Sequence, residues 1–167
     1  MATHKKAAST ERAIAIRTGQ PNDAQLVAAF NQRLAEESEG RRLDPDIIGP
    51  GVEAILADPT KGTYYLAEID GAVAGQLMIT TEWSDWRNGW FWWIQSVFVA
   101  PAFRGHGVYR ALHRHVEAIA KERGDVRGLR LYVEHDNARA RSTYERLGMT
   151  VTSYLLMETD WSGAISK

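Results

Sequence analysis

One stretch of the sequence constrains the fold more than any other: an apolar strand, two closely spaced glycines and a long amphipathic helix. The strand is predicted over 90–99 and ends before Pro101. Gly105 and Gly107 permit the tight turn that follows it. The helix is predicted over 107–123, with one apolar stripe formed by Val108, Ala111, Leu112, His115, Val116 and Ile119. We therefore expect a mixed α+β fold.

The remaining elements support this fold class. Asp70-Gly71 is typical of a tight hairpin turn and joins predicted strands at 63–69 and 73–80. Residues 40–59, rich in glycine and proline, are expected to be mostly loop around a short helix at 52–56. The other predictions are a strand at 13–17, a helix from residue 22 or 23 to 34, a tryptophan-rich loop at 82–89, a strand at 129–133, a helix from Asn137 to Gly148 and a last strand at 150–158.

Length and composition indicate one ordinary globular domain. The chain has 167 residues and a formal net charge of −1, so its overall charge does not favour nucleic acid as a partner. No cysteine is present, which excludes thiolate ligands, and no set of histidines has metal-ligand spacing; His115 is expected in the core and His113 at the surface. No apolar run approaches the roughly 20 residues that span a bilayer. We expect a tail at 1–12, one domain at 13–160, a tail at 161–167 and a cytoplasmic location, with no metal, membrane or nucleic acid as partner.

The glycine turn has two interpretations. The first amides of a helix have no backbone partner and lie at the positive end of the helix dipole, so the turn could hold a phosphate group. Arg104 would add a charge-assisted contact to that phosphate. The other interpretation is a plain strand-to-helix connection, and the local pattern does not separate the two. The segment lacks the ending of a P-loop and the third glycine of a dinucleotide-binding fingerprint.

Two motifs in the chain resemble those of the GNAT-type N-acetyltransferase superfamily. The superfamily's cofactor loop, Arg/Gln-x-x-Gly-x-Gly/Ala after a strand ending in Val-x-Pro, is matched by residues 99–109. Its second motif, Asn-x-x-Ala-x-x-x-Tyr-x-x-x-Gly-Phe, is matched by residues 137–149. Tyr109 replaces the small residue of the first motif, and Met149 replaces the aromatic residue of the second. The resemblance extends from about residue 14 to residue 158, and the two motifs have the superfamily's order and separation.

The resemblance implies a twisted central mixed sheet of about six to seven strands with splayed central strands, flanked by about four helices. It also implies that acetyl-CoA is the acyl donor and lies in the splay. Backbone groups of 97–99 would bind its pantetheine arm, amides of 105–110 its pyrophosphate, and Asn137 would touch it from the opposite wall. The residues so assigned to the cofactor are Val97, Phe98, Val99, Arg104, Gly105, His106, Gly107, Val108, Tyr109, Arg110 and Asn137.

The implied reaction is direct transfer of an acetyl group to a primary amine of a small molecule or a peptide, within a ternary complex. Tyr144 matches the superfamily's proton donor to the departing thiolate, and an unperturbed tyrosine keeps its proton at neutral pH. Without the motif, Tyr144 would be interpreted as a core aromatic. The base is less clearly marked, because Gln95 stands where some members have glutamate. Glu134 is the candidate base; Glu82, Asp85 and a water molecule are the alternatives.

The tryptophan-rich loop predicts an acceptor site. Trp83 and Trp86, next to Glu82 and Asp85, would form an aromatic and acidic wall suited to a cationic amine. The alternative is that these tryptophans are core residues.

Two other functions stay open at this point. One is a non-catalytic acyl-CoA-binding or sensor module on the same fold, which Tyr109 and Gln95 favour. The other is an interaction protein whose tryptophans form a partner surface. The sequence names neither the acceptor nor the oligomeric state; a homodimer is the commonest soluble assembly.

Overall fold

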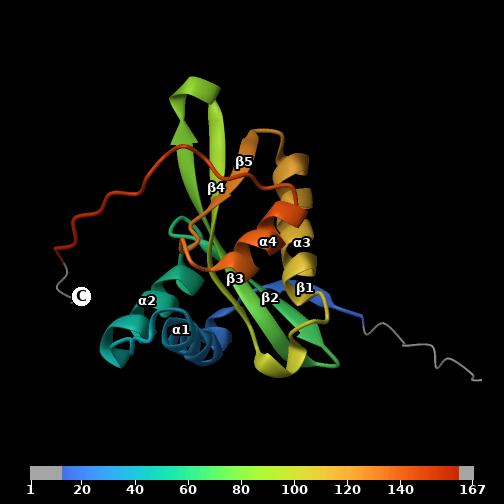
Figure 1. Ribbon diagram of the computed structural model, residues 1–167. Helices are drawn as coiled ribbons and strands as arrows, with labels where there is room; N and C mark the ends of the chain where they lie inside the picture. The colour runs from blue at the N-terminus through green and yellow to red at the C-terminus, as the bar shows by residue number, and fades with distance from the viewer. Residues whose placement is uncertain (1–12, 162–167) are drawn as a thin grey trace, which may run out of the picture.

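Residues 13–161 are described by this computed structural model and form a twisted sheet with helices on both faces (Figure 1). The predicted tail at 1–12 and residues 162–167 lie outside the described residues. Within them, one five-stranded sheet has the order β1-β2-β3-β4-β5, antiparallel except for the parallel pair β4 and β5. The strands are β1 (Ala15–Thr18), β2 (Thr63–Ile69), β3 (Ala72–Ser84), β4 (Gly89–Val99) and β5 (Val126–Leu131).

The helices divide the core between the two faces of the sheet. They are α1 (Ala24–Glu39), α2 (Pro45–Ala57), α3 (Val108–Arg123) and α4 (Ala138–Arg146). Because side chains alternate along a strand, Tyr64 and Leu66 of β2 pack under α1 and α2, whereas Tyr65 and Ala67 pack under α3. No helix in the described range is long and apolar enough to cross a membrane.

The predicted hairpin and the predicted long helix are both confirmed. Asp70 and Gly71 have φ angles of 52° and 79°, the left-handed values that a type I′ turn requires. α3 begins directly after Gly107 and buries a stripe formed by Val108, Leu112, Val116 and Ala120. The expectation for the histidines of α3 is wrong: His113 is 3% exposed, whereas His115 is half-buried at the edge of Tyr65. The helix buries a second row beside the stripe, where the ring of Tyr109 contacts His113.

The splay between the central strands lies along the second half of β4. Pairing of β4 with β5 ends at Ile94 and Leu131, but β4 continues to Val99 alongside β3 alone. A register shift in the β3–β4 pair marks a bulge here, and Ser96 has a φ of +50°, a strained value for a residue with a side chain. The bulge turns this part of β4 away from β5 and opens the sheet.

A buried chain of polar groups holds the bulge. Fully buried Gln76 donates from Nε2 to Oδ1 of Asn31 at 2.8 Å and, more weakly, to the carbonyl of Ser96 at 3.4 Å. Asn31 in turn donates to the hydroxyl of Tyr64 at 2.9 Å. The chain therefore links α1 to the strand that opens the sheet.

The predicted strand at 150–158 is wrong for the described structure. This segment pairs with no strand among residues 13–161, and its side chains are exposed. Apolar residues favour a strand, but a strand forms only where a neighbouring edge takes its backbone N–H and C=O groups. The sheet consequently has five strands in the described range, fewer than the six to seven expected.

Two predicted loop regions are more regular than expected. The predicted loop at 82–89 is a strand as far as Ser84 and turns only at Asp85–Arg87. The predicted short helix at 52–56 begins at Pro45, because proline suits the first helical position and the Asp44 side chain caps it, accepting from Asp46 N at 2.9 Å. The helix continues through Pro50.

Candidate functional site

A cavity of about 750 Å³ lies between the start of α3 and the side of α4. Its walls come from three segments: the end of β4 with the turn that follows, the first two turns of α3, and Asn137 with α4. The cavity adjoins the stretch of β4 that has left β5. Residues of the two sequence motifs therefore meet in one site.

Most residues predicted to bind the cofactor line this cavity: Val99, Arg104, Gly105, Gly107, Val108, Tyr109, Arg110 and Asn137. The other three do not line it. Val97 packs against the core beneath α3. The side chain of Phe98 is 3% exposed and turns to the opposite face, where its ring contacts Phe30 at 4.9 Å between centroids. His106 is exposed, with Nδ1 3.0 Å from the carbonyl oxygen of Arg104.

The glycine turn leaves the first amides of α3 open to the cavity. Gly105 and Gly107 have φ angles of 81° and 80°, which residues with side chains rarely adopt. Gly107 is the N-cap and supplies no side-chain acceptor. The first hydrogen bond of the helix runs from Ala111 N to Gly107 O at 2.9 Å, so the N–H groups of 108–110 have no helical partner. Such amides, at the positive end of the helix, suit an anion.

Tyr144 of α4 lines the cavity opposite these amides. Its ring meets Tyr109 edge to face, with centroids 5.5 Å apart. Burial raises the pKa of Tyr144 above the ordinary value for tyrosine, so its hydroxyl is protonated at neutral pH. Burial also raises the pKa of Tyr109, and the nearby Tyr144 raises it further. Tyr144 thus presents a neutral proton donor to the cavity.

Asn137 starts α4 and anchors the second wall of the cavity. Its side-chain oxygen accepts from Ala140 N at 3.0 Å, which caps the helix as predicted. The side-chain amide NH₂ of Asn137 makes no hydrogen bond within the described residues. It is therefore available to a ligand in the cavity.

Arg104 is the one predicted phosphate contact that already has an acidic partner. Its Nε donates to the carbonyl of Val99 at 2.9 Å, and its Nη2 forms an ion pair with Glu37. The guanidinium also lies over the ring of Phe98, 5.8 Å from the centroid. Arg104 therefore ties the glycine turn to the C-terminal end of α1.

Much of the positive charge of this site was not predicted from the sequence. Five arginines and no aspartate or glutamate line the cavity: Arg104, Arg110, Arg114, Arg139 and Arg146. Only Arg104 and Arg110 were predicted. The others could have been found from helical spacing, because Arg114 lies one turn after Arg110, and Arg146 lies two turns after Arg139 on α4.

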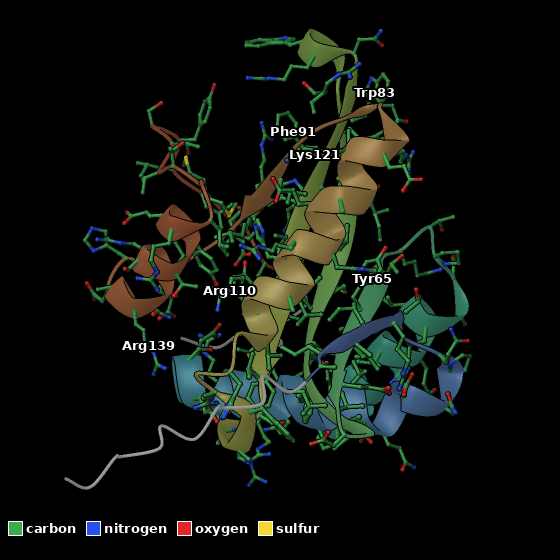
Figure 2. The ribbon with its side chains drawn as sticks, turned by 90° about the vertical axis from the view of Figure 1, so that its right-hand side faces the viewer. Tyr65, Trp83, Phe91, Arg110, Lys121 and Arg139 are labelled. Carbon is green, nitrogen blue, oxygen red and sulfur yellow. The ribbon has the colours of Figure 1, made fainter. Side chains whose placement is uncertain are left out.

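The predicted base and the predicted acceptor residues lie outside this cavity. Glu134 is exposed in the segment after β5. The hairpin tip holds Trp83 and Trp86, which are 49% and 87% exposed. Figure 2 shows Trp83 well away from Arg110 and Arg139. From Gly89 to Ile94, where the splay begins, β4 extends about 17 Å.

The acids of the hairpin differ in their surroundings. Glu82 forms an ion pair with Arg130 at 3.0 Å and accepts from Trp93 Nε1 at 2.6 Å. The guanidinium of Arg130 also lies 3.7 Å from the centroid of Phe91. Asp85 is exposed and accepts only from the backbone of Trp86, at 2.8 Å, within the described residues. Asp85 is thus the free carboxylate of the hairpin.

No group of three or more histidine, aspartate or glutamate side chains between residues 13 and 161 is placed to hold a metal ion.

Comparison with known proteins agrees with the fold and the position of the motifs. The sequence model of the Acetyltransferase (GNAT) family matches residues 26–149. Streptothricin acetyltransferase of Streptomyces lavendulae is 35% identical over 91 residues, which are 54% of this chain and 46% of that protein. The chain thus matches less than half the length of this curated relative.

Solved structures show the same architecture over most of the chain. A possible acetyltransferase from Clostridium difficile 630 has a TM-score of 0.83 and 41% identity, covering 88% of this chain and 97% of that one. A predicted acetyltransferase with acetyl-CoA from Clostridium acetobutylicum has a TM-score of 0.73 and 20% identity, covering 88% and 96% of the two chains. At 20% identity, the similarity to the Clostridium acetobutylicum structure shows a shared fold alone. With the family match extending over most of its length, this chain belongs to the acetyltransferase (GNAT) family.

Proposed function

We propose that this protein transfers an acetyl group from acetyl-CoA to a primary amine of a small molecule or peptide, within a ternary complex. The observation that supports this most strongly is that the open α3 amides and Tyr144 belong to the lining of one cavity. The amides of 105–110 would hold the pyrophosphate, and Asn137 would contact the donor from α4. The pantetheine arm would lie along 97–99, where β4 has no β5 partner. The Clostridium acetobutylicum neighbour with acetyl-CoA supports this choice of donor.

The proposed reaction is a direct displacement at the thioester carbonyl. The neutral amine forms a bond to the carbonyl carbon, the carbon–sulfur bond breaks, and the sulfur leaves as a thiolate. Tyr144 gives its proton to that thiolate, which its raised pKa permits at neutral pH. The amine nitrogen loses its proton to a base, for which Glu134 or a water molecule is proposed. Glu134 would act through water, because it does not line the cavity.

We propose that the acceptor is a cationic amine, contacted by Glu82, Trp83, Asp85 and Trp86. Exposed aromatic faces beside a free carboxylate favour cations over anions. Because the start of β4 at Gly89 is already about 17 Å from the splay, these residues would contact the distal part of an extended acceptor. The name of the relative from Streptomyces lavendulae, an acetyltransferase of streptothricin, supports a small-molecule acceptor.

The second candidate is a non-catalytic acyl-CoA-binding module. One observation favours it: no carboxylate lines the cavity, so no protein base lies beside the reacting atoms. An acetylation screen across small cationic amines and peptide N-termini separates the two functions. Release of CoA thiol that depends on the amine supports the transferase. Acetyl-CoA binding without thiol release for any amine favours the binding module.

A further inference from the structure

The cavity concentrates arginines that have no acidic partner. Arg110 and Arg139 make no hydrogen bond or ion pair with any other described residue. Arg146 donates only to the hydroxyls of Ser142 and Thr143, at 2.7 and 3.1 Å. The chain as a whole has nearly equal numbers of acidic and basic residues, 21 and 20. The lack of acids is therefore a local property of this cavity.

Several arginines elsewhere in the described structure are paired with carboxylates, although Arg87 and Arg127 are not. Arg17, Arg123 and Arg130 each pair with a carboxylate at 2.7 to 3.0 Å. Inside the cavity, Arg104 alone has such a partner, Glu37. Arg114 interacts electrostatically with Glu117, whereas Arg110, Arg139 and Arg146 have no carboxylate partner among the described residues. Positive charges gathered around one cavity repel one another, and a bound anion would relieve this repulsion.

The placement of these arginines also opposes the dipoles of two helices. Arg110 lies in the first turn of α3 and Arg139 in the first turn of α4, and neither first turn contains an acidic residue. A cation at a helix N-terminus is unfavourable, because that end is already positive. Figure 2 shows both residues on the same side of the molecule, one on each helix. Both helices therefore place positive charge where a bound anion would stabilise it.

The pyrophosphate of the proposed donor accounts for an anion at the α3 amides, but it does not account for the arginines. A pyrophosphate diester has two negative charges, and the open amides of α3 suit them. A phosphate monoester adds a charge of about −1.5 to −2 at neutral pH and three further acceptor oxygens. Guanidinium groups match phosphate oxygens in a bidentate manner. CoA has one such monoester, on its ribose 3′ position.

We propose that Arg110, Arg114, Arg139 and Arg146 bind the 3′-phosphate of the donor and make the enzyme selective for CoA thioesters over their dephospho forms. This inference rests on the proposed function. Arg110 and Arg114 approach the phosphate from α3, and Arg139 and Arg146 approach it from α4. α4 buries no residue fully, so the bridging phosphate also fastens α4 to the rest of the protein.

The test compares acetyl-CoA with acetyl-dephospho-CoA by calorimetric titration of the full-length protein at fixed salt concentration. Wild type is expected to bind the dephospho ligand at least about 30-fold more weakly. Arg139→Gln is expected to weaken acetyl-CoA binding about tenfold and to change binding of the dephospho ligand less than about twofold. Arg42→Gln removes the same charge from an exposed site in the α1–α2 connection, and neither affinity is expected to change. Arg139→Lys is expected to restore part of the loss.

Each other outcome overturns the inference in a distinguishable way. Equal affinity of wild type for both ligands would show that the 3′-phosphate is not recognised, and the proposed function would stand. A loss with Arg139→Gln that is the same for both ligands would place the arginine on another part of the donor. Failure of wild type to bind either ligand would overturn the proposed function as well.

Discussion

The ring of Tyr109 meets the ring of Tyr144 edge to face, with centroids 5.5 Å apart. Tyr109 belongs to the helix that follows the glycine turn, and Tyr144 to the short helix capped by Asn137. Because α4 buries none of its residues fully, this contact between two lining residues helps to hold Tyr144 at the cavity. Tyr109 replaces the small residue of the first motif, and its ring thus supports Tyr144, the proposed proton donor of the second motif.

Removing the Tyr144 hydroxyl should separate catalysis from binding. Tyr144→Phe keeps the ring contact, so acetyl-CoA affinity is expected to stay within about twofold, whereas kcat falls about 10²–10⁴-fold with loss of the general acid. Steady-state kinetics and calorimetry measure the two effects. Tyr109→Phe is the matched control, because the Tyr109 hydroxyl is buried without a hydrogen-bond partner and its loss should leave kcat nearly unchanged. If kcat of Tyr144→Phe falls by less than severalfold, Tyr144 has a structural role and is not the proton donor.

The pH dependence follows from the raised pKa of Tyr144. In the proposed mechanism its protonated form is the active one, so activity should be lost as pH rises through the folded pKa. Burial moves that pKa above 10, and no loss from this group is expected below about pH 10. A pH profile of kcat for wild type, compared with Tyr144→Phe, checks this. An alkaline limb well below pH 10 that disappears in Tyr144→Phe would contradict the direction of the shift.

Charge placed in the glycine turn should abolish donor binding. Gly107→Glu adds a carboxylate beside the open amides, and its Cβ would lie 3.2 Å from Arg110 Nη2. We expect acetyl-CoA binding to become undetectable by calorimetry while the circular dichroism spectrum stays native. Gly107→Ala has the same strain at φ +80° without the charge, and should retain measurable binding. Wild-type affinity in Gly107→Glu would remove the turn from the binding site.

The two tryptophans Trp86 and Trp92 should respond oppositely to truncation. Trp86 is 87% exposed, so Trp86→Ala should change stability by less than about 0.5 kcal/mol and raise KM for the amine several-fold. Trp92 is 6% exposed beneath α3, so Trp92→Ala should cost about 3–5 kcal/mol. Thermal melts and kinetics measure both. A destabilised Trp86→Ala with unchanged kinetics would make the hairpin tip structural.

Acid stability should depend on the Arg17–Asp23 pair. Arg17 donates to both oxygens of Asp23 at 2.7 and 2.8 Å, and this bonding holds the pKa of Asp23 below its usual value. The pair stabilises the fold above the ordinary pKa of aspartate, and this stability is lost as pH falls through the lowered folded pKa. Asp23→Asn should cost about 2 kcal/mol at pH 7 and flatten the decline below about pH 4 in denaturant titrations. The exposed control Asp136→Asn should change neither the stability at pH 7 nor its decline in acid. If the free energy of unfolding falls equally steeply with pH in wild type and in Asp23→Asn, the Arg17–Asp23 pair is not the cause of the acid sensitivity.

The sequence predicted the elements whose determinants are local. The turn at Asp70-Gly71 and the start of α3 after Gly107 both depend on glycine conformation, which a few residues specify. The ion pair of Glu82 was not predictable in this way, because its partner Arg130 comes from another strand. The burial of His113 was missed for a related reason, since it depends on a second covered row of α3 that the apolar stripe does not reveal.

The central claim is acetyl transfer at the cavity between α3 and α4, and the most direct measurement is product stoichiometry. The wild-type protein is mixed with acetyl-CoA and a panel of small cationic amines, and free CoA thiol and acetylated amine are both quantified by mass spectrometry. At least one amine is expected to give thiol and acetylated product in a one-to-one ratio, at a rate reduced about 10²–10⁴-fold in Tyr144→Phe. Thiol release that does not depend on the amine, or acetyl-CoA binding with no acetylated product for any amine, would contradict the account.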